Sequence, residues 1–285
     1  FVFSAVLVLC FAILVYRPIR TLSIGAKEFA KGNYSKKIPV HGNDDELGYI
    51  AASLNYMASN LDTIEETQRN FISNVSHDFR SPLTSIRGYV DAMLDGTIPP
   101  EMQEKYLNII LFETERLTKL TESLLELNKY EARKVILEMK DFDINGMIRQ
   151  ICETFEGTCK EKHLVFELLL SSDSLRVHAD MGKIQQVLYN LIDNAIKFSR
   201  ENSVIYIQTS LKYEKVFVSV KDTGIGIPAE QQENIFKPFT EVKDLTTGDG
   251  LGLPICSLIA AKMNGSLTLD IGYTKGTRFI LELHV

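Results

Sequence analysis

The chain has 285 residues, a length that suggests about two domains. Hydrophobic residues make up 45% and charged residues 24% of the chain, which excludes the disordered, collagen-like and disulfide-scaffold classes. The 31 Lys and Arg residues against 37 Asp and Glu residues give a formal net charge of -6, which argues against nucleic acid as the main partner because phosphate-neutralising domains are usually basic. Four cysteines are too few for a disulfide framework, and we expect reduced thiols that pack as small hydrophobes.

The first segment, residues 1–16, carries no charged side chain, and Arg17 and Arg20 follow it. A spanning helix needs about 20 apolar residues. We therefore expect a partial transmembrane helix over 1–16, in a fragment that opens on Phe1 inside the membrane segment. Positive charge at the exit predicts a cell-membrane protein whose residues from about Arg17 onward are cytoplasmic. A buried core helix is the alternative, disfavoured because no partner helix of that apolar character recurs downstream.

Two short helices joined by an extended connector are predicted over residues 17–67. Apolar residues at alternating spacings of three and four form one seam from Ile19 to Phe29 and a second from Leu47 to Ile64. Such seams are typical of coiled-coil strands, which need partners to bury them, so we expect a parallel homodimer. The arrangement resembles the HAMP signal-relay module, and a plain coiled-coil stalk is the alternative.

A helical hairpin is predicted over residues 68–133. The second seam continues to Met93 or Leu94, residues 95–101 break it with glycine and proline, and a second helix carries leucines in heptad register up to Leu127. Two such hairpins would pack as a four-helix bundle.

His77 lies off the apolar stripe of the first hairpin helix, with polar neighbours Asp78, Arg80 and Ser81. Pro82 clashes with the carbonyl four residues back, that of Asp78, so we expect a kink there. A neutral imidazole nitrogen is a competent nucleophile near neutral pH, and an adjacent carboxylate can fix its tautomer. On its own an exposed histidine is an ordinary surface residue. Its weight as a candidate catalytic residue, beside Asp78, comes from the motifs further along the chain.

Residues 140–285 mix helices with mostly antiparallel strands, which suggests a two-layer α/β sandwich. The predicted helices cover residues 143–160, 181–198 and 253–263. The predicted strands cover residues 164–170, 175–178, 204–211, 216–220, 265–271 and 277–285.

Within this region, Asn190, Asn194 and Lys197 share one helical face. Side-chain carbonyl oxygens there could hold Mg²⁺, which is also coordinated by substrate phosphates. The lysine could supply a point charge to those phosphates. Asp222 follows a predicted strand and could accept a hydrogen bond from an adenine amino group. Gly224 and Gly226 behind it allow the backbone to approach a planar base.

A third motif, residues 248–253, opens the helix predicted after it, and a helix start offers free N–H groups to phosphate. Residues 236–247 before it, with Lys237, form a plausible lid. Each of the three motifs is weak alone, and neither the Walker nor the dinucleotide-binding glycine pattern is present. Their joint order, downstream of a hairpin that bears His77, is the informative signal.

The blocks around His77 and at residues 190–198, 222–228, 236–239 and 248–253 resemble the five signature boxes of bacterial membrane-bound sensor histidine kinases. The resemblance implies a multidomain chain with an all-α part (membrane helix, HAMP coiled coil and dimerisation hairpin) followed by a Bergerat-type ATP-binding domain. It implies a two-component protein histidine kinase that uses ATP and Mg²⁺ to phosphorylate itself on His77 and passes the phosphoryl group to an aspartate of a response-regulator receiver domain.

By motif match, His77 is the phosphoacceptor and Asp78 its acidic neighbour, Asn190 and Asn194 serve Mg²⁺, and Asp222 serves adenine. The remaining residues matched to the nucleotide pocket are Lys197, Gly224, Gly226, Lys237, Gly248, Gly250, Leu251 and Gly252. Ser81 departs from the Thr or Asn of many relatives, which bears on phosphatase activity. The lid offers only Lys237 and Lys243 where some members have arginines, and Asp249 stands where Thr is common, so we expect weakened nucleotide contact.

Two other classes share part of this pattern. An ATP-driven clamp of the gyrase or heat-shock chaperone type would need a catalytic glutamate where Asn190 stands, and it would have no use for His77. A pseudokinase relay would bind nucleotide without transfer, which the intact His77, Asn194 and Asp222 disfavour. Transfer within or between protomers stays open, because it depends on the handedness of the turn at 95–101. The other histidines lack metal-ligand spacing and are predicted to be structural: His41, His163, His178 and His284.

Overall fold

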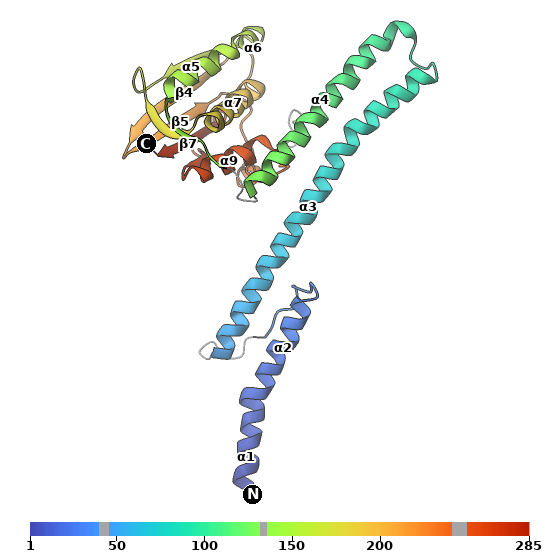
Figure 1. The fold of residues 1–285 in the computed structure, drawn as a ribbon, viewed down its shortest axis with the longest axis vertical. Helices are drawn as coiled ribbons and strands as arrows, with labels where there is room; N and C mark the ends of the chain where they lie inside the picture. Colours follow the sequence, from blue (N-terminus) through green and yellow to red (C-terminus); the bar gives the residue numbers. More distant parts are fainter. Residues whose placement is uncertain (40–45, 132–135, 241–249, 285) are drawn as a thin grey trace. The chain divides into compact units, whose positions relative to one another are not determined.

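The computed structural model describes residues 1–39, 46–131, 136–240 and 250–284 (Figure 1). The predictions for His41, Lys243, Gly248 and Asp249 lie outside these residues. The chain divides into two compact units, residues 1–76 and 77–285, which are described separately below.

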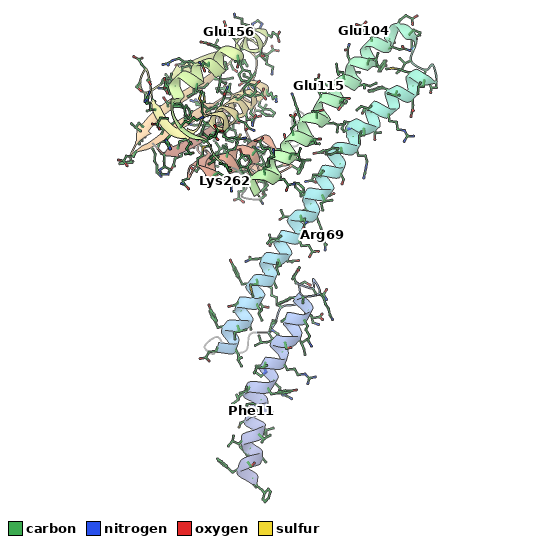
Figure 2. The ribbon with its side chains drawn as sticks, viewed as in Figure 1. Phe11, Arg69, Glu104, Glu115, Glu156 and Lys262 are labelled. Carbon is green, nitrogen blue, oxygen red and sulfur yellow. The ribbon has the colours of Figure 1, made fainter. Side chains whose placement is uncertain are left out.

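The first unit begins with an unbroken helical run, α1 (Val2–Phe11), the π-helical turn η1 (Ala12–Tyr16) and α2 (Arg17–Phe29). In this wide turn the Arg17 N–H donates to the carbonyl of Ala12, five residues back. Pro18, which follows, has no N–H to donate. Apolar side chains of α1, Phe11 among them, project outward (Figure 2). By length and composition, Val2–Phe29 is long and apolar enough to cross a membrane. The predicted apolar helix therefore continues beyond residue 16.

The chain after α2 is held against the start of α3 (Glu46–Leu94) by one side chain. The Ile38 N–H donates to Asn55 Oδ1 at 2.8 Å, and Asn55 Nδ2 donates to the Ile38 carbonyl at 2.8 Å. Ile38 packs in a small core with Phe29, Ala51 and Ala58. A small apolar core shared by α2, the segment after it and the start of α3 agrees with the relay-module prediction.

In the second unit, the end of α3 and α4 (Pro100–Glu131) form the predicted hairpin (Figure 1). Gly96, at φ +79, makes the turn. Pro82 lies inside α3 without ending it, so the expected kink does not break the helix.

The α/β part contains a five-stranded sheet and a separate two-stranded one. The large sheet has the order β2-β4-β5-β7-β6, in which β2 is parallel to β4 and the other neighbours are antiparallel. Its strands are β2 (Val165–Leu169), β4 (Val204–Lys212), β5 (Lys215–Lys221), β6 (Ser266–Leu269) and β7 (Arg278–His284). The small sheet pairs β1 (Met139–Asp143) with β3 (Arg176–Asp180).

Helices α7 (Met181–Phe198) and α9 (Gly252–Lys262) pack against this sheet, α7 on β5 and α9 on β6 and β7. A four-residue helix, α8 (Ala229–Gln232), lies between β5 and α9 in the sequence. The core between the layers is aliphatic and contains Leu188, Leu191, Ile192, Ile205, Ile207, Val216, Val218, Ile259 and Leu281. The two-layer α/β fold is thus as predicted.

One predicted element is divided and one strand was not predicted. The helix predicted over 143–160 forms as two helices, α5 (Ile144–Thr154) and α6 (Glu156–Glu161), and strand β1 precedes them. Asp143 ends the strand and caps α5, because its Oδ1 accepts hydrogen bonds from the N–H groups of Asn145 and Leu175. These contacts lower the pKa of Asp143 even though burial opposes them.

Candidate functional site

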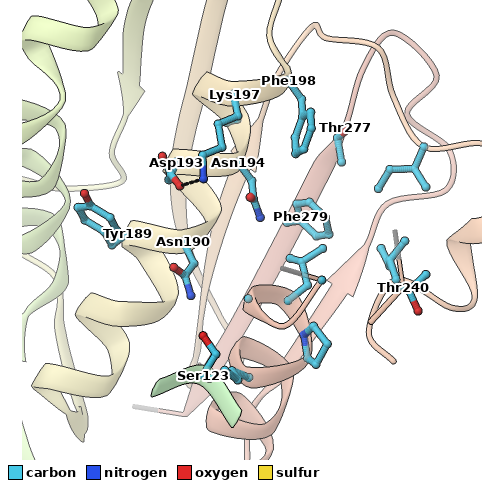
Figure 3. Close-up of a pocket in the computed structure, with 18 of the residues that line it drawn as sticks. Ser123, Tyr189, Asn190, Asp193, Asn194, Lys197, Phe198, Thr240, Thr277 and Phe279 are labelled. Atoms are coloured by element: carbon cyan, nitrogen blue, oxygen red, sulfur yellow. Dashed lines mark ion pairs between the residues drawn. The ribbon is translucent and has the colours of Figure 1, made fainter. Parts of the chain in front are cut away.

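A cavity of about 470 Å³ opens between α7, α9, the turn after β5 and the end of α4 (Figure 3). The structure brings to it the predicted residues Asn190, Asn194, Lys197, Asp222, Gly226, Gly250 and Gly252. These residues come from three motifs that are far apart along the chain. The site therefore forms only when the chain folds and brings the three motifs together.

The asparagines reach the cavity because α7 is strongly amphipathic. Asp180 caps the helix by accepting from the Lys183 N–H at 3.1 Å, and the apolar face of the helix is buried in the core. Asn190 and Asn194, one turn apart, then project from the other side toward the cavity (Figure 3). Lys197 also lines it, but its Nζ lies 2.5 Å from Asp193 Oδ2, so in this state the lysine is ion-paired on its own helix.

Asp222 is buried and tightly held, with 4% of its surface exposed. Its Oδ1 accepts hydrogen bonds from the N–H groups of Gly224, at 2.8 Å, and Thr277, at 3.0 Å. Burial raises the pKa of Asp222, and these hydrogen bonds counteract that rise only in part. The carboxyl is therefore a fixed acceptor in a poorly solvated place.

Glycines let backbone segments approach one another around Asp222. A Cβ at Gly224 would overlap the Phe198 carbonyl group, and Gly226 has φ +72. Gly250 has φ +62 and its carbonyl accepts from the Phe239 N–H at 3.0 Å.

Three predicted residues do not line the cavity in this structure. Gly224 shapes the turn from behind, Leu251 is buried, and the Lys237 ammonium donates to Asn234 Oδ1 at 2.8 Å.

Several site residues were missed from the sequence. Thr277 lines the cavity and donates to Asp222, and the Tyr273 hydroxyl donates to the Asp222 carbonyl at 3.0 Å. A Cβ at Gly276 would overlap that same carbonyl. The pair Gly276-Thr277 at the start of a strand is a local signal that would have pointed to a close backbone approach.

Helix α4 was also not predicted to border the cavity. Lys119, Glu122, Ser123 and Glu126 line it from that side. Glu126 anchors the helix to α7, because its two carboxylate oxygens accept from Lys183 Nζ at 2.9 Å and Gln186 Nε2 at 2.6 Å.

Apolar contacts add to this anchor. Leu127 and Tyr130 are buried, and Lys183 Nζ lies 5.4 Å from the centre of the Tyr130 ring. Burial alone would lower the pKa of Lys183, but the hydrogen bond to Glu126 and the charge of that carboxylate outweigh it, and the pKa is raised. We call the contact of Glu126 with Lys183 and Gln186 the α4 clamp.

His77 lies on α3 with 80% of its side chain exposed, and its Nδ1 is 3.2 Å from Asp78 Oδ1. The Tyr89 ring of α3 stacks on the Tyr106 ring of α4, with centroids 5.2 Å apart. His77 precedes Tyr89 by as many residues as Thr118 follows Tyr106, and helices rise about 1.5 Å per residue, so His77 and Thr118 lie at similar heights on the hairpin. The cavity-lining segment of α4 therefore begins near the height of His77.

The donor set at the cavity suits one kind of metal. Among the described residues, no group of three or more His, Cys, Asp or Glu side chains is arranged to hold an ion. The amide oxygens of Asn190 and Asn194 are hard, neutral donors on one edge of the cavity. Such a pair fits Mg²⁺, which binds through few protein ligands and completes its shell with water and substrate phosphates.

Comparison with known families divides the chain into three domains. Residues 12–63 match the HAMP domain, and residues 67–133 match the His Kinase A phospho-acceptor domain. Residues 179–285 match the histidine kinase-, DNA gyrase B- and HSP90-like ATPase family.

Similar proteins carry the same order of parts. The signal transduction histidine-protein kinase ArlS of Staphylococcus aureus is 30% identical over 283 residues, which cover 98% of this chain and 62% of ArlS. The solved structure of Acinetobacter baumannii histidine kinase AdeS is 28% identical with a TM-score of 0.62, covering 73% of this chain and 97% of that one. Histidine kinase ThkA, solved in complex with response regulator protein TrrA, is 34% identical with a TM-score of 0.64, covering 75% of this chain and 61% of that one.

A phosphoacceptor hairpin joined to an ATPase-type α/β domain defines a class, the histidine kinases. With its HAMP domain and its similarity to ArlS along nearly its whole length, this chain belongs to the sensor histidine kinases.

Proposed function

We propose that the chain is a protein histidine kinase of a two-component system. It uses ATP to phosphorylate His77 and passes the phosphoryl group to an aspartate of a response-regulator receiver domain. The observation that carries this is the convergence of Asn190, Asn194 and Asp222 on one cavity, in the unit whose hairpin bears the exposed His77. The chain spans about 62% of the length of ArlS, and the activity proposed here is that of these residues.

In the cavity, Asp222 accepts a hydrogen bond from the adenine amino group, and Gly226 leaves room for the base. Asn190 and Asn194 hold Mg²⁺ through their amide oxygens, and Lys197 exchanges Asp193 for a phosphate oxygen. Bound Mg²⁺ supplies charge neutralisation on the phosphates, which is the main requirement of phosphoryl transfer. A solved structure of the similar protein ShkA, 27% identical with a TM-score of 0.57 over 75% of this chain and 45% of that one, contains AMPPNP.

On the hairpin, Asp78 accepts a hydrogen bond from the Nδ1–H group of His77, which leaves the Nε2 lone pair free. Nε2 forms the new bond to the γ-phosphorus while the bond from that phosphorus to the bridging oxygen of ADP breaks. The Nδ1 proton stays on the imidazole, whose positive charge is balanced by Asp78. The carboxylate of the regulator then takes the phosphoryl group from Nε2 and returns the imidazole to its neutral form.

The chain acts as a homodimer. Leu107, Leu111 and Phe112 of α4 are each more than half exposed, which an isolated hairpin has no means of covering. A second hairpin would bury them in a four-helix bundle. Val2–Phe29 contains the membrane anchor, and Arg17 and Arg20 at the end of its apolar part support a cytoplasmic location for the rest of the chain. The domain limits at residues 16, 67, 133 and 140 stay predictions.

Two rivals of this function fit less well. A gyrase- or chaperone-type clamp shares the ATPase family but would leave the phosphoacceptor match over 67–133 without a role. A pseudokinase would lack one of the groups that the transfer needs, whereas His77 is exposed and Asn194 and Asp222 both line the cavity.

The test replaces the acceptor and the metal-binding group separately in the full chain. With γ-labelled ATP, His77→Gln is expected to lose all autophosphorylation while its affinity for nucleotide stays at the unmodified level. Asn194→Ala is expected to lose autophosphorylation because Mg²⁺-nucleotide is no longer held in a reactive position.

The control is His178→Gln, since His178 is paired with Asp141 on the β1–β3 ribbon, and it should label normally. Full labelling of His77→Gln would refute the acceptor. Normal Mg²⁺-nucleotide binding and labelling in Asn194→Ala would refute the pocket assignment.

A further inference from the structure

We propose that Cys256 is a positioning residue that orients the carboxamide of Asn190, so that its oxygen faces the cavity and its nitrogen faces the protein. This inference rests on the proposed function, because it concerns how the same site takes Mg²⁺. It assigns a task to a buried thiol that does not itself line the cavity.

The geometry joins two helices through one sulfur atom. Cys256 lies in the first turns of α9 and is completely buried. Its Sγ accepts a hydrogen bond from Asn190 Nδ2 at 3.5 Å and donates to the Val187 carbonyl of α7 at 4.0 Å. Cys256 thus contacts α7 at two points one turn apart, and one of them is the amide nitrogen of a proposed metal ligand.

The buried thiol can play both parts of this arrangement. A neutral thiol donates one hydrogen bond and accepts another. With the S–H directed to the Val187 carbonyl, the sulfur lone pairs are left for the Asn190 amide.

An asparagine amide needs such a partner because its two ends have opposite chemistry. Only the oxygen binds a cation, and the NH₂ group would repel one. Here the nitrogen end faces α9, since a Cβ on Gly252 would lie 3.9 Å from Asn190 Nδ2.

The start of α9 has no side-chain cap, so its first-turn N–H groups are available as donors. On their own they would attract the oxygen of the Asn190 amide and turn its nitrogen toward the cavity. Cys256 adds a sulfur acceptor in the same place. The sulfur therefore selects the orientation in which Nδ2 of Asn190 points to α9 and its oxygen is left for the cation. Partners of this kind set the affinity of a metal site because they fix its ligands in advance.

The experiment compares three variants of the full chain, Cys256→Ala, Cys256→Ser and Cys152→Ala. Cys152 is the matched control, because it too is a buried thiol, and it lies on α5 and does not line the cavity. Binding of AMPPNP, which cannot donate its terminal phosphate, is measured by calorimetry, once with EDTA and once over a series of Mg²⁺ concentrations. Melting temperatures of all variants are recorded alongside.

We expect Cys256→Ala to need about 10-fold more Mg²⁺ for half-maximal enhancement of AMPPNP binding, with its affinity in EDTA unchanged. Cys256→Ser keeps a donor and an acceptor at the same place and should stay close to the unmodified protein. Cys152→Ala should bind Mg²⁺ and AMPPNP normally, whatever it does to the melting temperature.

An equal loss of AMPPNP affinity with and without Mg²⁺ in Cys256→Ala would show a packing role and overturn the inference. An unchanged Mg²⁺ requirement in a folded Cys256→Ala would overturn it as well. In both cases the unmodified chain still binds Mg²⁺-AMPPNP, which separates this failure from that of the proposed function, in which the unmodified chain would not bind.

Discussion

The cavity and the hairpin hold their reactive groups in opposite ways. Asp222 is 4% exposed and accepts hydrogen bonds from two backbone N–H groups, whereas the side chain of His77 is 80% exposed, with its Nδ1 beside Asp78. Folding thus prepares the nucleotide side in advance and leaves the acceptor side open. An acceptor that receives a phosphoryl group from one protein surface and gives it to another has to be reachable by both, and a buried imidazole would be reachable by neither.

The largest effect is expected at Asp222, the cavity residue proposed to bind the adenine base. Asp222→Asn places an NH₂ group in a position where a carboxylate oxygen faced the adenine amino group. A lost hydrogen bond to a charged group costs about 1.5 to 3 kcal/mol, so the affinity for AMPPNP should fall roughly 10- to 100-fold. Calorimetry measures this, and Asp173→Asn, an exposed position outside the cavity, is the control.

The same residue gives a pH dependence of known sign. Burial raises the pKa of Asp222, so its carboxyl takes up a proton at a higher pH than an ordinary aspartate does. Only the ionised carboxyl is a full acceptor, so AMPPNP affinity should fall as the pH decreases through that raised pKa. In the Asp222→Asn variant this acidic loss should disappear. If the unmodified chain and the variant lost affinity in parallel, some other group would be responsible.

A smaller effect is expected from the glycine that makes the Asp222 turn possible. Gly224→Ala would push a methyl group into the Phe198 carbonyl, which is backbone and cannot swing away. Overpacking of this kind costs about 1 to 3 kcal/mol, and a lower melting temperature of the ATP-binding domain should report it. The matched control is Gly157→Ala, because a Cβ at that helical glycine of α6 meets nothing within 4 Å, and it should leave the melting temperature unchanged or raise it.

The smallest effect is expected at the α4 clamp, which ties helix α4 of the hairpin to α7 beside the cavity. Glu126→Gln removes the charge that holds Lys183, a partly exposed contact worth about 1 kcal/mol. Amide hydrogen exchange at residues 120–130 should become a few times faster. The charge exchange Glu126→Lys with Lys183→Glu should restore much of the protection, and Glu115→Gln, exposed on the same helix, should change nothing. Unaltered exchange in Glu126→Gln would mean that the apolar contacts alone hold α4.

Much of this organisation could be predicted because its signals are local. The 3.6-residue period and the Asp180 cap fix α7 over the same residues that the sequence predicts, and the glycine motifs mark the turns of the cavity. Strand β1 was missed because it is short and largely exposed. Its last residue, Asp143, is also the N-cap of α5, so the sequence there indicates a helix start. No local pattern could reveal Cys256 or Glu126 as neighbours of the site, since each meets its partner across 57 or more residues of sequence.

The ion pair between Lys197 and Asp193 has a consequence for selectivity. A bare ammonium group at the mouth of a cavity would attract inorganic phosphate, sulfate and every other small anion of the cell. With a carboxylate already in place, a free anion has to displace that carboxylate before it can bind the lysine, and it gains little. A nucleotide bound through its base as well, as proposed above, would have binding energy to spare for the displacement, so the resting site would discriminate against solutes that resemble just one end of that ligand.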